Sequence, residues 1–179
     1  MHAQLREIEA EFHAALDRLH QLANSVPPDR WSRRPGPDRW SAVECIAHLN
    51  LTTLAFRPLV ERALEEARRL SLPAGSRFRR GLFGWLLWRA LSSPGRFRVK
   101  TQPSFVPVAA AHVEEVVAEF ERLQQEQIGW VRAADGLPLG RVKVPSPFDR
   151  RVKYNLFACL AILPRHQHRH LWQAEQAMR

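Results

Sequence analysis

The sequence predicts an all-α protein that folds as a four-helix bundle. Four long segments carry apolar residues at helical spacing, and a long connection separates the second segment from the third. Extended segments are minor or absent, so helix-on-helix packing is the arrangement that buries the apolar stripes. The length of 179 residues suits a single domain, 1–179, with one core.

The first predicted helix covers about residues 2–24, where large apolar side chains recur every three or four positions. These side chains are Leu5, Ile8, Phe12, Leu16, Leu19 and Leu22. The helix ends before Pro27 and Pro28, and the proline-rich connection that follows forbids regular helix.

The second predicted helix has the clearest start in the chain, within the residues WSAVECIAHLN. Ser41 is a strong N-cap candidate, and Glu44 follows three residues later, which together make a capping box. We expect this helix to run to about Arg69 and to bend at Pro58.

The connection at 71–108 is irregular by composition and contains no acidic residue. Its inner run, GLFGWLLWRAL, is compatible with a short helix. The favoured interpretation is a crossover that packs its aromatic side onto the core. The alternative is a membrane-surface or substrate-access element, because basic residues beside Trp85 and Trp88 suit an interface.

The third helix is predicted from Ala109 to about Arg132. A loop rich in glycine and proline follows, and it includes a short extended piece, LGRVKV. The last segment, from about Tyr154 to Met178, is helical in pattern on either side of Pro164.

Composition narrows the classes of function. The net charge of +9 invites a nucleic-acid interpretation, but the basic residues spread over the whole chain and form no recognition module, so we disfavour it. No apolar run is long enough to span a membrane. The N-terminus is polar, and Cys45 and Cys159 lie in apolar segments, so we expect a cytoplasmic protein with reduced thiols.

Three histidines alternate in the motif HQHRH near the C-terminus. On a helix, residues four apart share a face, so His166 and His170 point the same way and His168 points away, towards solvent. Two neutral imidazoles one turn apart can chelate a divalent metal. The motif lacks the glutamate of HExxH, which argues against a metalloprotease.

A third ligand must come from elsewhere, and His48 on the second helix is the best candidate. The alternative for this residue is a core histidine that is hydrogen-bonded to a carbonyl or carboxylate. His112 is a weaker candidate. Three further histidines belong to the first helix and are interpreted as surface residues: His2, His13 and His20.

Several neighbours could assist such a site. Glu44 is either a capping residue or a general base behind the ligands, and Gln173 could hydrogen-bond a ligand histidine or the bound water. Arg165 and Arg169 flank the histidines, where they attract substrate carboxylates or face solvent. Cys45 lies close in sequence to His48, but a buried structural thiol is the favoured interpretation.

The motif WSAVECIAHLN, followed about 110 residues later by HQHRHLWQ, resembles the DinB-like (damage-inducible, YfiT-like) superfamily. The resemblance implies a three-histidine metal site of His48, His166 and His170 in a bundle of up-down-down-up order. The connection at 71–108 would then be the crossover, with a basic insertion at 77–100 beyond the minimal family pattern. The metal in such proteins is usually zinc or nickel, and many members form homodimers.

This resemblance also suggests a reaction. A divalent metal on three neutral histidines activates water or stabilises a thiolate, and characterised relatives resemble transferases and isomerases that depend on low-molecular-weight thiols. We therefore expect a thiol-dependent S-transferase, or a hydrolase, that acts on a small molecule. The alternatives are a non-catalytic, metal-stabilised binding or stress-response protein, and a basic protein associated with a membrane surface.

Overall fold

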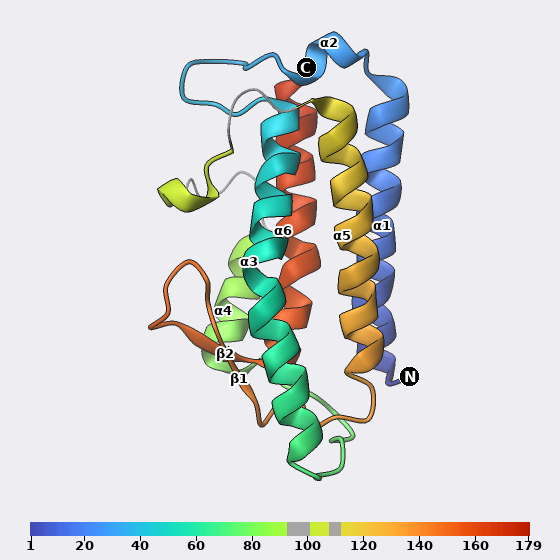
Figure 1. The fold of residues 1–179 in the computed structure, drawn as a ribbon, viewed down its shortest axis with the longest axis vertical. Helices are drawn as coiled ribbons and strands as arrows, with labels where there is room; N and C mark the ends of the chain where they lie inside the picture. Colours follow the sequence, from blue (N-terminus) through green and yellow to red (C-terminus); the bar gives the residue numbers. More distant parts are fainter. Residues whose placement is uncertain (93–100, 108–111) are drawn as a thin grey trace.

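The computed structural model of the protein describes residues 1–92, 101–107 and 112–179. Four long helices make a bundle in which the first and last run one way and the middle two the other (Figure 1). These helices are α1 (Ala3–Ser25), α3 (Ala42–Arg69), α5 (Val113–Ala133) and α6 (Leu156–Ala177). The predicted all-α bundle with up-down-down-up order is thereby confirmed.

The connections follow from this order. α3 and α5 run in the same direction, so the chain returns along the bundle between them. The described part of that return contains α4 (Gly81–Leu91) and the short 3-10 helix η1 (Pro103–Phe105). The single turn α2 (Pro28–Trp31) lies between α1 and α3, where the prolines were expected to exclude helix; Pro28 is at its start, a position that tolerates proline. Part of the predicted 77–100 insertion, residues 93–100, lies outside the described residues.

The helices occupy the corners of a square. α3 packs against α5 and α6, and α1 packs against the same two helices, so α1 and α3 stand at opposite corners. The neighbours α3 and α6 are the two helices that carry the candidate histidines. The fold therefore brings together motifs that are more than a hundred residues apart.

α3 begins as the sequence predicts. The Ser41 hydroxyl accepts a hydrogen bond from the Glu44 backbone N–H at 3.4 Å, and the Glu44 carboxylate accepts one from the Ser41 N–H at 2.8 Å. The helix continues through Pro58 to Arg69 without interruption.

The start of α6 differs from the prediction. Tyr154 belongs to a strand, β2 (Lys153–Asn155), which pairs antiparallel with β1 (Lys143–Pro145) within the expected extended region. The helix begins one residue after β2, because the Asn155 side chain accepts a hydrogen bond from the Ala158 N–H at 2.8 Å and so acts as the N-cap. From there α6 runs unbroken past Pro164.

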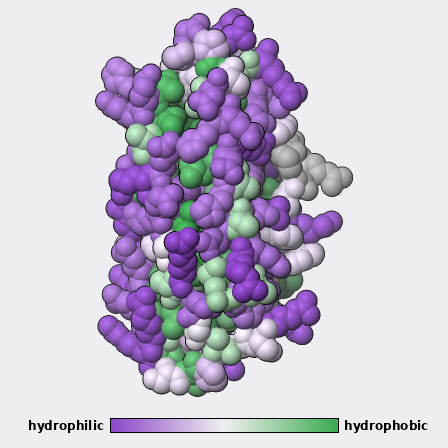
Figure 2. Space-filling model, turned by 90° about the vertical axis from the view of Figure 1, so that its right-hand side faces the viewer, coloured by the Kyte–Doolittle hydropathy of each residue, from purple (hydrophilic) through white to green (hydrophobic). Residues whose placement is uncertain are grey.

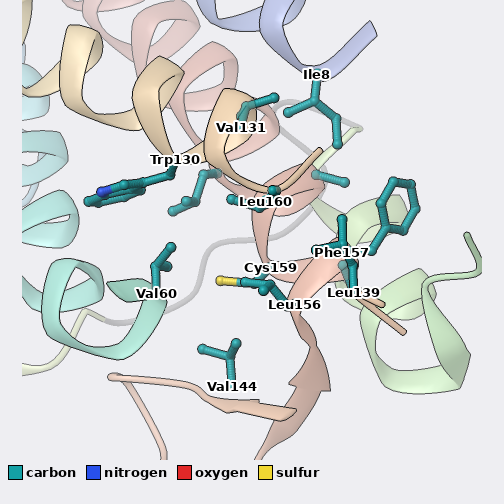
Figure 3. Packing of buried hydrophobic residues seen from close by; sticks show 14 of the residues in the cluster. Ile8, Val60, Trp130, Val131, Leu139, Val144, Leu156, Phe157, Cys159 and Leu160 are labelled. Carbon is teal, nitrogen blue, oxygen red and sulfur yellow. The ribbon is translucent and has the colours of Figure 1, made fainter. Parts of the chain in front are cut away.

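Two apolar clusters fill the bundle. Figure 3 shows the larger cluster, where side chains of α1, α3, α5 and α6 meet those of the β1–β2 region. The second cluster lies at the other end and includes Leu19, Ile46 and Leu171. Buried polar residues lie between them along each of three helices: Thr52, Thr53, Gln124, Gln127 and Gln167.

One glutamine pair crosses the centre of the bundle. The amides of Gln124 and Gln167 exchange hydrogen bonds of 2.7 and 3.0 Å, which connect the diagonal helices α5 and α6. Gln124 also donates to the Phe12 carbonyl of α1 at 2.5 Å. A satisfied polar network of this kind favours one alignment of the helices over others.

α4 is packed on one side only. Gly84 is buried, and Leu87, Trp88 and Leu91 pack against the larger cluster, as expected for a crossover that covers the core. The opposite side, with Phe83 and Trp85, stays exposed, so the expected packing of aromatic residues from 71–108 onto the core holds for Phe78, Trp88 and Phe105 but not for these two.

The rest of the surface is more polar. Figure 2 shows the side of the bundle on which α1 and α5 lie, which is mainly hydrophilic with hydrophobic residues between the polar ones. Within the described ranges, no helix has the length and apolar character needed to cross a membrane.

A glycine sets the distance between α4 and α6. A Cβ atom at Gly84 would lie 2.5 Å from the Cβ of Ala158, whereas a Cβ at the exposed helical Gly129 would meet nothing within 4 Å. We expect Gly84→Ala to destabilise the protein by about 1–3 kcal/mol, and Gly129→Ala to stabilise it by up to about 1 kcal/mol. Chemical denaturation measures both, and equal effects of the two substitutions would contradict this packing.

Candidate metal centre

Three histidines from two helices meet at one side of the bundle. His48 comes from α3, and His166 and His170 come from successive turns of α6. One ring nitrogen from each lies within 4.8 Å of the other two. The ring centroids are 4.4 Å apart for His48 and His170, 4.5 Å for His166 and His170, and 5.3 Å for His48 and His166.

The proton of His48 is fixed by its partner. The Nδ1 atom lies 2.8 Å from the backbone carbonyl oxygen of Phe105 in η1. A carbonyl oxygen only accepts, so Nδ1 carries the hydrogen and donates it. In the neutral ring, Nε2 then keeps its lone pair, which is the atom that a metal ion would use.

All three imidazoles are held in the neutral form. Burial lowers the pKa of His48, and the hydrogen bond with the Phe105 carbonyl partly offsets this effect. Burial lowers the pKa of His166 to about 3, with further lowering from His48 and Arg169. Burial also moves the pKa of His170 well below its ordinary value. Interactions with His166, His48 and Arg169 lower it further, and a hydrogen bond with Gln173 opposes the shift.

An aromatic wall surrounds the rings. Trp40 stacks near His170 with 6.1 Å between centroids and lies 5.0 Å from His48. Phe105 meets the edge of His48 at 6.5 Å, and Phe148 meets His166 at 6.2 Å. Phe148, in the loop between β1 and β2, also packs on Phe105 at 4.4 Å. Segments from three separate connections thus enclose the histidines.

Sequence reasoning did not identify this wall. Phe105 and Phe148 lie in irregular, proline-rich segments, and no local spacing relates them to the histidines. Trp40 precedes the N-cap of α3, a position that predicts contact with the following helix but not with α6.

Glu44 lies in the first turn of α3, and its carboxylate already has hydrogen-bond partners. It accepts hydrogen bonds from the Arg34 guanidinium and from the Ser41 N–H. Burial alone would raise the pKa of Glu44, but the hydrogen bonds from Arg34 and Ser41 and the charge of Arg34 outweigh it, so the pKa is lowered. This arrangement favours the capping interpretation over that of a general base.

The two flanking arginines differ. Arg165 places its guanidinium over the Trp88 ring at 5.0 Å and pairs with Glu11 at 3.1 Å, on the side of α6 that faces α4 and α1. The positive charge of Arg169 lowers the pKa values of both His166 and His170. The charge of Arg169 therefore lies close enough to the histidines to act on two of them.

The remaining histidines lie outside the group. His112 is exposed at the N-cap of α5, and His13 is exposed on α1. His20 pairs with Glu121 at 2.7 Å. His168 was expected to be exposed, but it is half-buried against α1, with its Nε2 atom 3.4 Å from the Glu11 carboxylate.

Cys45 does not compete for a cation. The side chain is buried, and burial raises the pKa of the thiol to about 12, so it stays protonated near neutral pH. In the described part of the chain, the close group of donor atoms consists of His48, His166 and His170.

The group suits a divalent ion of intermediate softness. Neutral imidazole nitrogens are the ligands that zinc and nickel share, whereas magnesium and calcium prefer oxygen. The Nδ1 atom of His170 is buried, and the described residues offer it no hydrogen-bond partner. Such an atom is costly unless it gains a partner, and a divalent ion held by the three rings would be one such partner.

Comparison with known families adds one match. The family model described as the DinB superfamily matches residues 11–174, and so includes α3, α6 and all three histidines. No curated protein matches the chain. No solved structure matches it either.

The buried neutral histidines predict a pH dependence of stability. In the unfolded chain they titrate near 6.5, whereas in the fold their pKa values are lower. Between about pH 7 and pH 5 the unfolded chain therefore binds more protons, and acid favours unfolding. The melting temperature of the protein in chelator should fall over this range.

A matched pair of variants checks the source of that dependence. His48→Gln combined with His166→Gln and His170→Gln should flatten the pH profile, whereas His13→Gln, at an exposed position, should leave it unchanged. An identical slope in the triple variant and the parent would mean that these rings are not the buried neutral groups responsible.

Proposed function

Because this chain belongs to the DinB superfamily, we propose that it is a metal-dependent enzyme that acts through His48, His166 and His170. The observation that carries the proposal is the convergence of three neutral imidazoles within 4.8 Å, two of them buried and one half-buried, with His48 oriented by a backbone carbonyl. Zinc or nickel is the ion we expect, because both accept nitrogen ligands in this arrangement.

We propose transfer of a low-molecular-weight thiol to a small electrophile as the reaction. His48, His166 and His170 would hold the metal, which would favour the deprotonated form of a bound thiol. The thiolate sulfur forms a bond to the electrophilic atom of the second substrate. The leaving group departs with its bonding electron pair, and the thiol proton passes to solvent.

The residues around the site support this reaction over hydrolysis. Hydrolysis gains from a free carboxylate that deprotonates water, and Glu44, the candidate for that role, already accepts hydrogen bonds from Arg34 and Ser41. Thiol transfer needs no such base once the thiolate is formed. Trp40, Phe105 and Phe148 offer an apolar border for the electrophile, and Arg169 offers a positive charge for the carboxylates of the thiol.

Other parts of the proposal concern the setting of the enzyme. We expect it to act in the cytoplasm, where low-molecular-weight thiols stay reduced, and to form homodimers, as the family resemblance suggests. The second candidate is a metal-stabilised binding protein without turnover. The hydrogen bond that orients His48 supports this candidate equally, because a structural ion would need the same oriented ligand.

Metal content tests the site. Protein purified without a polyhistidine tag should contain about one equivalent of a divalent ion. His48→Ala and His170→Ala should each lower the content at least about tenfold, because each variant removes a ligand. His13→Ala, an exposed histidine on α1, should retain the parent content. Elemental analysis gives the readout, and unchanged content in both ligand variants would contradict the proposed site.

Turnover separates the enzyme from the binding protein. A panel of bacillithiol, mycothiol and glutathione with a chromogenic electrophile should show conjugation above the uncatalysed rate with at least one thiol. A chelator should abolish this activity, and added zinc or nickel should restore it. Full metal occupancy with no conjugation for any thiol would instead support the binding protein.

A further inference from the structure

The outward side of α4 is an apolar surface without a partner in the described part of the chain. Leu82 is 69% exposed, Phe83 64%, Leu86 48% and Trp85 46%. These four lie within two turns of one helix, whose other side is fixed to α6 by Gly84 and Trp88. A helix that is apolar all round is normally buried or in contact with lipid. We therefore expect a binding partner to cover this surface.

Positive charge borders the same surface. Arg77, Arg79 and Arg80 precede α4, and Arg89 follows Trp85, over whose ring its guanidinium lies at 6.0 Å. No acidic residue occurs between Glu66 and Glu114 in the sequence. Within the described ranges, none of these four arginines forms a salt bridge with a carboxylate. The border is therefore positive, although the charge of Glu7 acts on Arg80.

A hollow of about 480 Å³ joins the two features. It is lined by the three arginines before α4 together with Leu82 and Trp85, so its wall is cationic on one side and apolar on the other. The guanidinium of Arg80 is held over the Trp88 ring at 4.3 Å, and its Nε atom is buried with no hydrogen-bond partner among the described residues. The first turn of α4 adds free backbone N–H groups beside these arginines.

From this arrangement we propose that α4 docks the protein onto an anionic phospholipid surface. Leu82, Phe83, Trp85 and Leu86 would enter the boundary between headgroups and acyl chains. The arginines would contact lipid phosphates, with the hollow before α4 receiving a headgroup. Amphipathic elements with tryptophan and basic residues bind membranes in this way without spanning them.

Two other occupants fit less well. A second copy of the chain, joined through α4 by a two-fold axis, would bring arginines against arginines with no acidic residue from this region to pair with them. Single-stranded nucleic acid could stack on Phe83 and Trp85, but it leaves the aliphatic Leu82 and Leu86 uncovered. An anionic phospholipid surface covers the apolar side chains of α4 with its acyl chains and pairs the arginines with its phosphates.

Vesicle co-sedimentation tests the proposal on the full chain. The protein should sediment with vesicles of phosphatidylcholine and phosphatidylglycerol, and weakly or not at all with phosphatidylcholine alone. Salt should weaken the binding. Phe83→Ser combined with Trp85→Ser should lower the affinity tenfold or more, as an order-of-magnitude expectation from lost apolar burial. Arg77→Gln and Arg79→Gln should each lower it about fivefold.

Matched controls keep the result specific. Leu54→Ser removes an apolar side chain from α3 that is 38% exposed, and Arg62→Gln removes an exposed charge from the same helix. Both should bind vesicles as the parent does. Unchanged melting temperature and metal content in the α4 variants would show that the fold and the histidine site are intact, since this proposal does not depend on the metal site.

Three results would overturn the proposal. The first is equal sedimentation of the parent and the Phe83/Trp85 double variant. The second is binding of single-stranded DNA, but not of anionic vesicles, by the parent. The third is a dimer in sedimentation velocity that the double variant converts to a monomer, in a parent that does not bind vesicles, because α4 would then be a contact between subunits.

Discussion

The contact between α3 and α6 places one imidazole of the second long helix against two of the last, with ring centroids 4.4 to 5.3 Å apart. Three such rings cannot all take up protons in a buried place, because burial and mutual repulsion oppose the charge. The three rings also cannot supply all of one another's hydrogen bonds, because the Nδ1 atom of His170 has no hydrogen-bond partner within the described residues. A bound cation would give the three nitrogen atoms a shared partner, and for this reason the metal proposal rests on the packing of these two helices.

The rest of the fold supports that contact. The Gln124–Gln167 pair aligns α6 with α5 across the bundle, one residue beyond His166. The crossover supplies the Phe105 carbonyl that fixes the proton of His48. The hairpin loop adds Phe148, which packs on Phe105. Up-down-down-up order makes the long crossover necessary, and the crossover then completes the site.

The same crossover also carries α4, which has two different sides. Gly84 allows a close approach to Ala158, so the inner side is fixed to α6. The outer side leaves large apolar residues and arginines exposed. A single connection can thus complete the candidate metal centre at one end and offer a membrane-binding surface along its helix, two roles that can be separated by substitution.

Part of the fold and of the candidate site could be predicted from residues that are close together in the sequence. The capping box at Ser41, the helical spacing of α1 and the interval of four between His166 and His170 depend on neighbours in sequence, and each agrees with the structure. The aromatic wall, the Arg34 pairing of Glu44 and the position of His168 against Glu11 depend on which helices become neighbours. Strand β2 escaped prediction because a three-residue strand next to a helix has too few residues to show a period of two.

X-ray absorption spectroscopy of the metal-loaded protein tests the central claim most directly. The account predicts a first coordination shell of nitrogen and oxygen only, with the multiple-scattering pattern of three imidazoles and distances of about 2.0–2.1 Å if the ion is zinc. Sulfur in that shell, at about 2.3 Å, would assign a ligand role to a cysteine and contradict the account. A shell with fewer than two imidazoles would contradict it equally, because α3 and α6 could not both be holding the ion.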